Sequence, residues 1–154
     1  MPKVLVIEDG SEYTETLTRF LGQAFAFERA GSGPQALERL ATEGFDAVFL
    51  DMRFDRAPDG ELMGDVDEVA DRFNGDPVQA RRFLEDHQGN YVLAALRDAG
   101  HRVPVLFSYD FTSEPRRWER VAQRYAPVAF LPDVASPTEV AARLRELISS
   151  SRPA

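Results

Sequence analysis

The sequence contains no cysteine, so disulfide bonds and thiolate metal sites are excluded. It also has no apolar run that approaches the ~20 residues needed to span a membrane. The apolar stretch from Val4 to Ile7 is too short for a secretory signal peptide and is followed by two acids. These absences predict a cytoplasmic protein without a membrane partner.

Positive charge is also scarce. The chain of 154 residues carries 18 lysines and arginines against 26 acids, which gives a net charge of −8. A surplus of negative charge repels the phosphates of nucleic acids and of anionic lipids. We therefore expect no nucleic-acid partner, and instead contacts with cations or basic protein surfaces. The length fits one compact domain that can bury a core without disulfides.

Short apolar runs alternate with helical patterns along the chain. The runs predict strands buried on both faces at 3–7, 25–29, 46–51, 103–107 and 128–131. The segments between them predict helices, including one capped by Ser11, a long one from Pro77 to Gly100 with a weak point at Gly89, and a last one with a capping box at Ser136. This alternation predicts an α/β fold with a doubly wound, five-stranded parallel sheet. We expect a single domain over residues 1–150 and a frayed tail at 151–154.

Acids stand where two of these strands end. Glu8 and Asp9 follow the first strand, Asp51 ends the third, and Ser108 closes the fourth. If the first and third strands are neighbours, the carboxylates converge, and a hard cation such as Mg²⁺ would relieve their repulsion. A carboxylate beside Mg²⁺, with a hydroxyl opposite, can accept a phosphoryl group. The alternative for each acid alone is a helix cap or a turn residue.

Four stretches, VLVIEDG, FDAVFLDM, VPVLFSYD and FLPD, resemble the receiver domain of two-component response regulators. The resemblance implies a flavodoxin-like fold and Mg²⁺ bound by Glu8, Asp9, Asp51 and the backbone carbonyl of Arg53. It implies that Asp51 accepts phosphate from a sensor histidine kinase or a phosphotransfer protein, and that Ser108 contacts the phosphoryl group. Such a module is not an enzyme beyond its own phosphorylation and dephosphorylation, and it signals to a downstream protein target, here unknown.

The sequence departs from that family at three places. Leu131 stands before Pro132 where the family has a lysine, and Val128 takes the place of an aromatic residue. Asp51 and Ser108 are also 57 positions apart (108 − 51), far more than a receiver needs. Arg53 could supply a substitute cation for the missing lysine. The alternative is that Arg53 is solvated or pairs with Asp55.

The surplus length lies in an insertion of about residues 53–76. Apolar residues from Leu62 to Phe73 fall at helical spacing and predict an amphipathic helix after the third strand. Three interpretations stay open, namely a solvated extra helix, a docking surface for a basic partner, and a lid over the acid cluster. The middle of the insertion is strongly acidic. Between Asp55 and Asp71 there are seven acids against one base, Arg56, and the acids are Asp55, Asp59, Glu61, Asp65, Asp67, Glu68 and Asp71.

Three functions compete on this evidence. The first is a stand-alone receiver that binds Mg²⁺, takes phosphate on Asp51 and signals by protein contact. The second is a phosphorylation-independent pseudo-receiver adaptor, which Leu131 and the insertion favour. The third is an aspartyl-phosphate phosphatase. Those enzymes carry a second aspartate two positions after the nucleophile, and Arg53 at that position argues against them.

Overall fold

The structure is a computed structural model that describes residues 1–58 and 60–151. Its centre is a parallel sheet with the strand order β2-β1-β3-β4-β5. The doubly wound parallel sheet predicted from the sequence is confirmed, and β1 and β3 are neighbours. The strands are β1 (Lys3–Ile7), β2 (Ala26–Ala30), β3 (Ala47–Asp51), β4 (Val105–Ser108) and β5 (Val128–Leu131).

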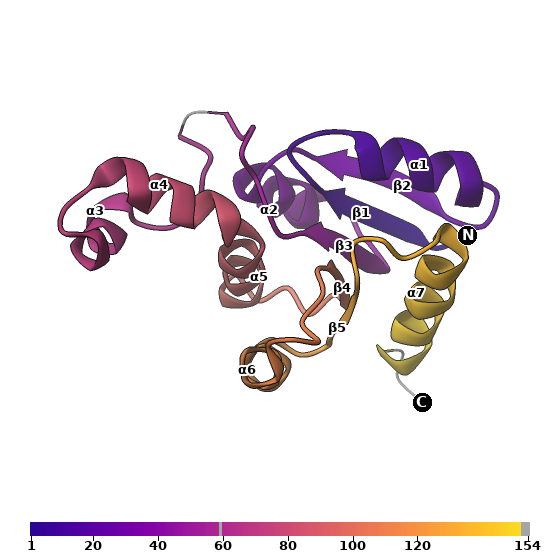
Figure 1. Cartoon of the computed structure of the whole chain (residues 1–154). Coiled ribbons are helices and arrows are strands. Elements are labelled where there is room, and N and C mark those ends of the chain that lie inside the picture. The colour runs from indigo at the N-terminus through magenta and orange to yellow at the C-terminus, as the bar shows by residue number, and fades with distance from the viewer. Residues whose placement is uncertain (59, 152–154) are drawn as a thin grey trace.

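Helices cover both faces of the sheet (Figure 1). One face carries α1 (Glu12–Leu21) and α7 (Pro137–Ser151), and the other carries α2 (Gly33–Thr42), α5 (Gln88–Asp98) and α6 (Pro115–Tyr125). Alternate strand residues serve the two cores. In β1, Val4 and Val6 pack toward α1 and α7, and Leu5 and Ile7 pack toward α2 and α5. Burial on both faces explains why the strands read as continuous apolar runs.

The helix ends follow the predicted capping pattern only in part. The Ser136 hydroxyl accepts a hydrogen bond from the Glu139 backbone N–H (3.2 Å), as its capping box predicts. Ser11 does not cap α1, because its hydroxyl donates to the Glu15 carboxylate instead. The helix α7 continues to Ser151, and the rest of the predicted frayed tail lies outside the described residues.

The long helix predicted from Pro77 to Gly100 is two helices, α4 (Pro77–Asp86) and α5, which meet at His87. Gly89 explains the break. Its backbone N–H donates to the carbonyl oxygen of Met52 (2.8 Å), directly after β3. A Cβ at Gly89 would stand 2.6 Å from the Asp51 carbonyl oxygen. The chain therefore turns here so that the start of α5 can pack against the end of β3, and the weak point lies where the sequence placed it.

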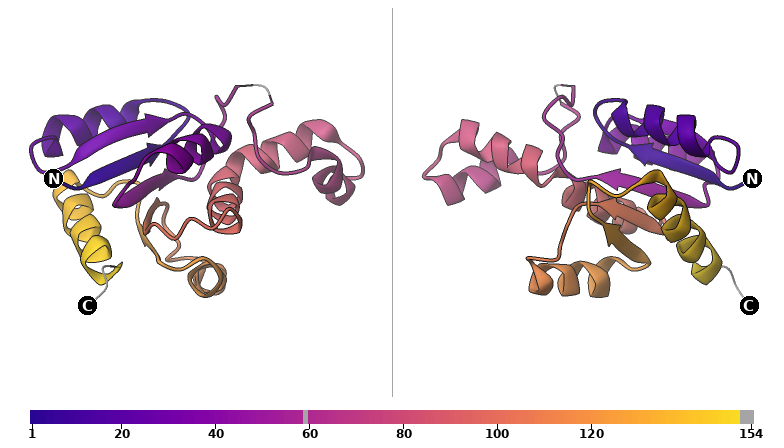
Figure 2. Two further views of the ribbon diagram at one scale, coloured as in Figure 1. Left: turned by 180° about the vertical axis from the view of Figure 1, so that it is seen from behind. Right: turned by 45° about the vertical axis from the view of Figure 1, so that its right-hand side comes forward.

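The second part of the insertion and the helix that follows it form a projecting lobe, which we call the arm and define as residues 62–86. It contains α3 (Val66–Ala70), the 3₁₀ helix η1 (Asp71–Phe73) and α4. The helix predicted from Leu62 to Phe73 begins only at Val66, and its last three residues form the 3₁₀ helix η1. The arm has a small core of its own made by Val69, Ala70, Ala80 and Leu84. It stands away from the sheet in all three views (Figures 1 and 2).

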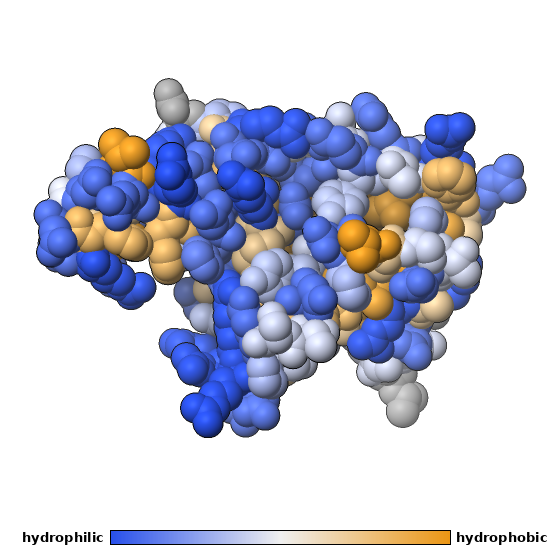
Figure 3. Space-filling view, viewed as in Figure 1, coloured by the Kyte–Doolittle hydropathy of each residue, from blue (hydrophilic) through white to orange (hydrophobic). Residues whose placement is uncertain are grey.

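The helical part of the insertion is thus an appendage and not a lid over the strand ends. Asp59 of the acidic segment lies outside the described residues. On the face shown in Figure 3 the surface is mostly hydrophilic, with apolar patches on the arm and beside α1 and α7. Among residues 1–58 and 60–151, no helix has the length and apolar character required to cross a bilayer.

Candidate functional site

The strand register brings the predicted residues to one edge of the sheet. Asp51 and Ser108 are direct partners across β3 and β4. Ile7 is paired with Leu50 across β1 and β3, so Glu8 and Asp51 follow at the same level. Because all strands are parallel, these residues stand at the carboxyl edge, where ligands bind in open α/β sheets.

Asp51 is the most perturbed acid at this edge. Burial raises the pKa of its carboxyl group to about 7, and the negative charges of Asp9, Glu8 and Asp133 add to the effect. A hydrogen bond from the Met52 backbone N–H (2.9 Å) opposes the rise. The Asp51 carboxylate therefore lies in an environment that is short of positive charge.

Glu8 is almost fully buried, with 1% of its surface exposed, and turns toward α1. One carboxylate oxygen accepts the Tyr13 backbone N–H (3.1 Å), and the other accepts the backbone N–H and the hydroxyl of Thr14 (both 2.7 Å). Glu8 thus caps the amino end of α1, the role that was predicted for Ser11. A carboxylate is favoured there because the amino end of a helix carries partial positive charge.

Asp9 is held by the first residues of the insertion. Its carboxylate accepts the Arg56 backbone N–H (2.5 Å), and the Arg56 guanidinium lies 3.8 Å from its second oxygen. The same guanidinium forms two hydrogen bonds with Glu12, at 2.9 and 3.1 Å. Sequence reasoning missed Arg56, and no local signal in the sequence connects it with a residue 47 positions earlier.

The predicted metal ligands are gathered but do not form a closed cluster. In the part of the chain that the structure describes, no three acidic, histidine or cysteine side chains are arranged to hold a metal ion. Glu8 is turned into the α1 cap and Asp9 is shared with Arg56. The remaining donors still fit Mg²⁺, which often takes only one or two carboxylates and keeps several waters. Asp51 and Asp9 would supply those carboxylates, and a cation would offset the burial and the neighbouring negative charges that raise the pKa of Asp51.

Arg53 lies on the rim of this site. Its side chain is 66% exposed and pairs with Asp86 (3.1 Å) and more loosely with Asp55 (3.6 Å). It lines an open cleft of about 580 Å³ above Asp51, whose other walls include Tyr109 and Arg117. No hydrogen bond or ion pair joins Arg53 to Asp51 among the described residues. The Arg53 guanidinium therefore neutralises Asp55 and Asp86 rather than Asp51 in this structure.

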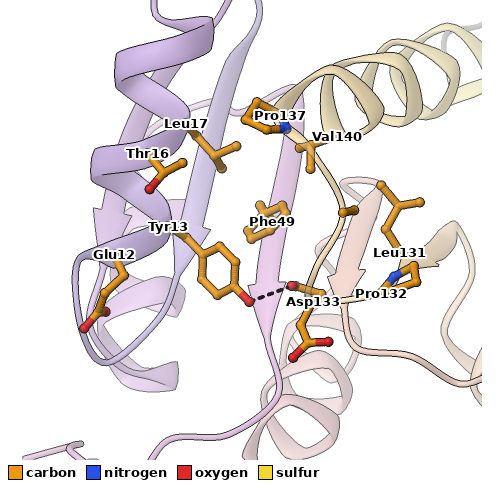
Figure 4. Close-up of a pocket in the computed structure, with 12 residues that line it drawn as sticks. Glu12, Tyr13, Thr16, Leu17, Phe49, Leu131, Pro132, Asp133, Pro137 and Val140 are labelled. Carbon is orange, nitrogen blue, oxygen red and sulfur yellow. Dashed lines mark hydrogen bonds between the residues drawn. The ribbon is translucent and has the colours of Figure 1, made fainter.

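Ser108 is buried and makes a contact that the sequence did not suggest. Its hydroxyl donates to the Tyr13 hydroxyl of α1 (3.0 Å), the bond marked by the dashed line from Tyr13 in Figure 4. Tyr13 and Asp133 both reach this edge, although neither was among the predicted site residues. Asp133 follows Pro132 in the FLPD stretch, so its place after the fifth strand was the available signal.

Leu131 puts an apolar side chain at the end of β5, before Pro132. Leu131, opposite Ser108 in the sheet, lines a cavity of about 210 Å³ between α1 and the start of α7 (Figure 4). The chain has a single lysine, Lys3, and it pairs with Glu28 and Glu43 at the start of β1. No lysine can therefore neutralise a phosphoryl group at Asp51.

No protein-family model matches the sequence, and no curated protein is significantly similar to it. Solved structures do match. The receiver domain of the Francisella response regulator 1452 is 18% identical with a TM-score of 0.67, covering 99% of this chain and 100% of its own. The non-phosphorylated HemR receiver domain of Leptospira biflexa is 24% identical with a TM-score of 0.64, covering 100% and 99%.

A third match is the CheY-like receiver domain protein of Methanospirillum hungatei JF-1. It is 12% identical with a TM-score of 0.63, and the match covers 97% of this chain and 95% of that one. At these identities the likeness speaks for the fold, and the strand order and the acidic edge described above agree with it. The chain therefore has the CheY-like, flavodoxin-type α/β fold of response-regulator receiver domains.

Proposed function

We propose that the chain is a receiver module that binds Mg²⁺ and accepts a phosphoryl group on Asp51. The observation that carries this proposal is the pairing of Asp51 with Ser108 at the carboxyl edge of the sheet, beside Asp9. This pairing puts a nucleophilic carboxylate next to a hydroxyl donor in an open cleft of about 580 Å³, which has room for a phosphodonor.

The reaction transfers a phosphoryl group from the donor to an oxygen of Asp51. An Asp51 carboxylate oxygen attacks the phosphorus of the donor, the bond from phosphorus to the donor breaks, and the leaving group departs with the bonding electrons. Only the ionised carboxylate is a nucleophile, and a pKa of about 7 leaves Asp51 partly protonated at neutral pH. Asp51 and Asp9 would hold Mg²⁺ with the Arg53 carbonyl, and the bound ion would favour the ionised carboxylate and neutralise phosphoryl charge.

The surroundings predict a weaker acceptor than the family's pattern. A phosphorylated aspartate carries about two negative charges at neutral pH. Leu131 offers no cation, and Asp133 adds a negative charge close enough to affect the pKa of Asp51. Arg53 pairs with Asp86, Arg56 with Glu12, and Arg117 with Glu114, so each of these arginines already has a carboxylate partner. The phosphorylated state therefore depends on Mg²⁺ more than it would with a lysine present.

The proposed partners come from the resemblance to receiver domains. A sensor histidine kinase or a phosphotransfer protein would supply the phosphoryl group, and a protein target would read the phosphorylated state. Catalytic turnover is not part of the proposal, because an arginine holds position 53, where aspartyl-phosphate phosphatases place a second acid.

A second candidate is a pseudo-receiver adaptor that works without phosphorylation. Two observations favour it. Arg56 already compensates Asp9, and Leu131 is packed among the apolar residues of the α1 and α7 face. In that case the acidic edge is a structural remnant, and the arm or another face carries the interaction.

Intact-mass measurement separates the two candidates. The protein is incubated with acetyl phosphate and Mg²⁺, and Asp51→Asn is treated in parallel. Asp98→Asn is the matched control, because it removes an exposed carboxylate at the far end of α5. A phosphoryl adduct that requires Mg²⁺ and is absent only from Asp51→Asn supports the receiver. No adduct in the wild-type chain supports the adaptor, and continuous phosphate release over many turnovers would indicate an enzyme.

A further inference from the structure

Tyr13 stands between two hollows of the molecule. Its ring borders the cleft above Asp51 and also the cavity of about 210 Å³ that Leu131 lines. The ring packs on Phe49 of β3, with centroids 5.1 Å apart. Figure 4 shows the side chain reaching from α1 across the strand ends toward β4. The Tyr13 hydroxyl is thus placed beside the acceptor site by the packing of its ring.

The Tyr13 hydroxyl occupies the hydrogen bond that Ser108 can donate. Ser108 donates to Tyr13 at 3.0 Å, and a serine hydroxyl has a single proton to give. Ser108 is only 4% exposed, so bulk water offers few alternative partners. While the proton is directed at Tyr13, it is not available to a phosphoryl oxygen on Asp51, the residue opposite Ser108 in the sheet.

Glu8 holds the backbone of Tyr13 in place at the start of α1. Its carboxylate accepts the backbone N–H of Tyr13 (3.1 Å) and caps the first turn of α1. The backbone of Tyr13 is therefore anchored, and its ring is supported by Phe49. The bond between Tyr13 and Ser108 is a consequence of how α1 docks on the sheet and not of a mobile surface side chain.

We propose that Tyr13 is a positioning residue that restrains phosphoryl transfer to Asp51 by holding the hydroxyl proton of Ser108. This inference rests on the proposed function, because it concerns the same site. For Ser108 to assist the transfer, its O–H must turn from Tyr13 to the incoming phosphoryl oxygen, so the resting bond must be broken first. Once Asp51 is phosphorylated, the Tyr13 hydroxyl no longer accepts a hydrogen bond from Ser108.

The variant Tyr13→Phe tests the proposal because it keeps the ring on Phe49 and removes only the hydroxyl. We expect the initial rate of Asp51 phosphorylation by acetyl phosphate and Mg²⁺ to rise about two- to tenfold, the range that corresponds to one net hydrogen bond. In a Ser108→Ala background the same substitution should leave the rate unchanged. Tyr125→Phe, which removes a phenolic hydroxyl at the end of α6, is the matched control and should behave as wild type.

A spectroscopic measurement distinguishes positioning from packing. With ¹³C at the hydroxyl-bearing ring carbon of the four tyrosines, the signal missing from Tyr13→Phe identifies Tyr13. That signal should shift when the wild-type adduct forms, and it should not respond in Ser108→Ala. An unchanged or lower rate in Tyr13→Phe overturns the proposal, as does a faster rate that persists without Ser108 or a signal that ignores phosphorylation. Absence of any wild-type or variant adduct by mass instead overturns the proposed function, and this inference with it.

Discussion

The backbone N–H of Arg56 donates a hydrogen bond to the Asp9 carboxylate (2.5 Å), and this bond ties the start of the insertion to the acidic edge of the sheet. The Arg56 guanidinium adds a looser ion pair with the same carboxylate at 3.8 Å. The insertion therefore influences the site through this loop, even though its helices project away from it.

This relationship predicts that Arg56→Gln tightens Mg²⁺ binding. The variant keeps the backbone bond to Asp9 and removes the positive charge that competes with the cation. Because the guanidinium is 57% exposed and therefore screened by solvent, we expect a gain of at most about fivefold in affinity. Calorimetric titration with MgCl₂ measures it. Arg116→Gln, an exposed arginine on α6, is the control and should change nothing, and weaker binding by Arg56→Gln would contradict the prediction.

The raised pKa of Asp51 predicts a pH-dependent stability in the presence of a chelator. The folded chain holds a proton on Asp51 up to about pH 7, whereas the unfolded chain releases it near the ordinary value of 3.8. The folded state binds more protons between these values, so the contribution of Asp51 to stability falls as the pH rises through that window and is constant above it.

The variant Asp51→Asn removes this penalty. We expect it to be about as stable as wild type near pH 4 and more stable above pH 7, by on the order of 2–4 kcal/mol. Urea unfolding at a series of pH values measures the difference, with Asp98→Asn as the control. A difference between Asp51→Asn and wild type that does not vary with pH would count against a protonated Asp51.

Gly89 is expected to tolerate no side chain. A Cβ there would meet the Asp51 carbonyl oxygen at 2.6 Å and a Phe107 ring atom at 2.7 Å. We predict that Gly89→Ala lowers the free energy of unfolding by about 1–3 kcal/mol, despite the higher helix propensity of alanine. Gly44→Ala is the matched control, because nothing lies within 4 Å of a Cβ at that position. Equal stability of the two variants would show that α5 can shift away from β3 at little cost.

Arg97 is a buried cation whose hydrogen-bond acceptors are backbone carbonyl oxygens and not carboxylates. Its guanidinium, 9% exposed as a residue, donates to backbone carbonyl oxygens at 2.8–2.9 Å. Burial lowers its pKa to about 10, so it stays charged at neutral pH. The acceptors close the ends of α5 and α6 and the start of β5, and they belong to His101, Val103, Tyr125 and Pro127.

Replacing Arg97 by methionine removes these four hydrogen bonds while keeping much of the apolar volume. The Pro127 carbonyl still accepts the Val105 backbone N–H (3.1 Å). We expect a loss of about 2–4 kcal/mol in the free energy of unfolding, since each unpaired buried polar group costs about 1 kcal/mol or more. Thermal and urea unfolding measure it. Arg120→Met on the exposed part of α6 should cost less than about 0.5 kcal/mol. A similarly mild effect at Arg97 would mean that water replaces the guanidinium.

The sequence by itself determined the alternation of strands and helices, the parallel sheet, and the place of Glu8, Asp9, Asp51 and Ser108 at its carboxyl edge. These features follow from local patterns, because a strand buried on both faces reads as an apolar run and its end is marked by the first polar residue. Gly89 as a weak point and Ser136 as a cap were predictable for the same reason.

Tertiary structure alone decided how those polar residues are used. Glu8 turns into the α1 cap, Arg56 reaches Asp9, and Tyr13 accepts the hydrogen bond that Ser108 donates. Each contact depends on how elements distant in the sequence dock against each other, and on competition between several nearby donors for one acceptor. A linear pattern contains no information on which donor wins, because that outcome is set by distances of a few tenths of an ångström in the folded chain.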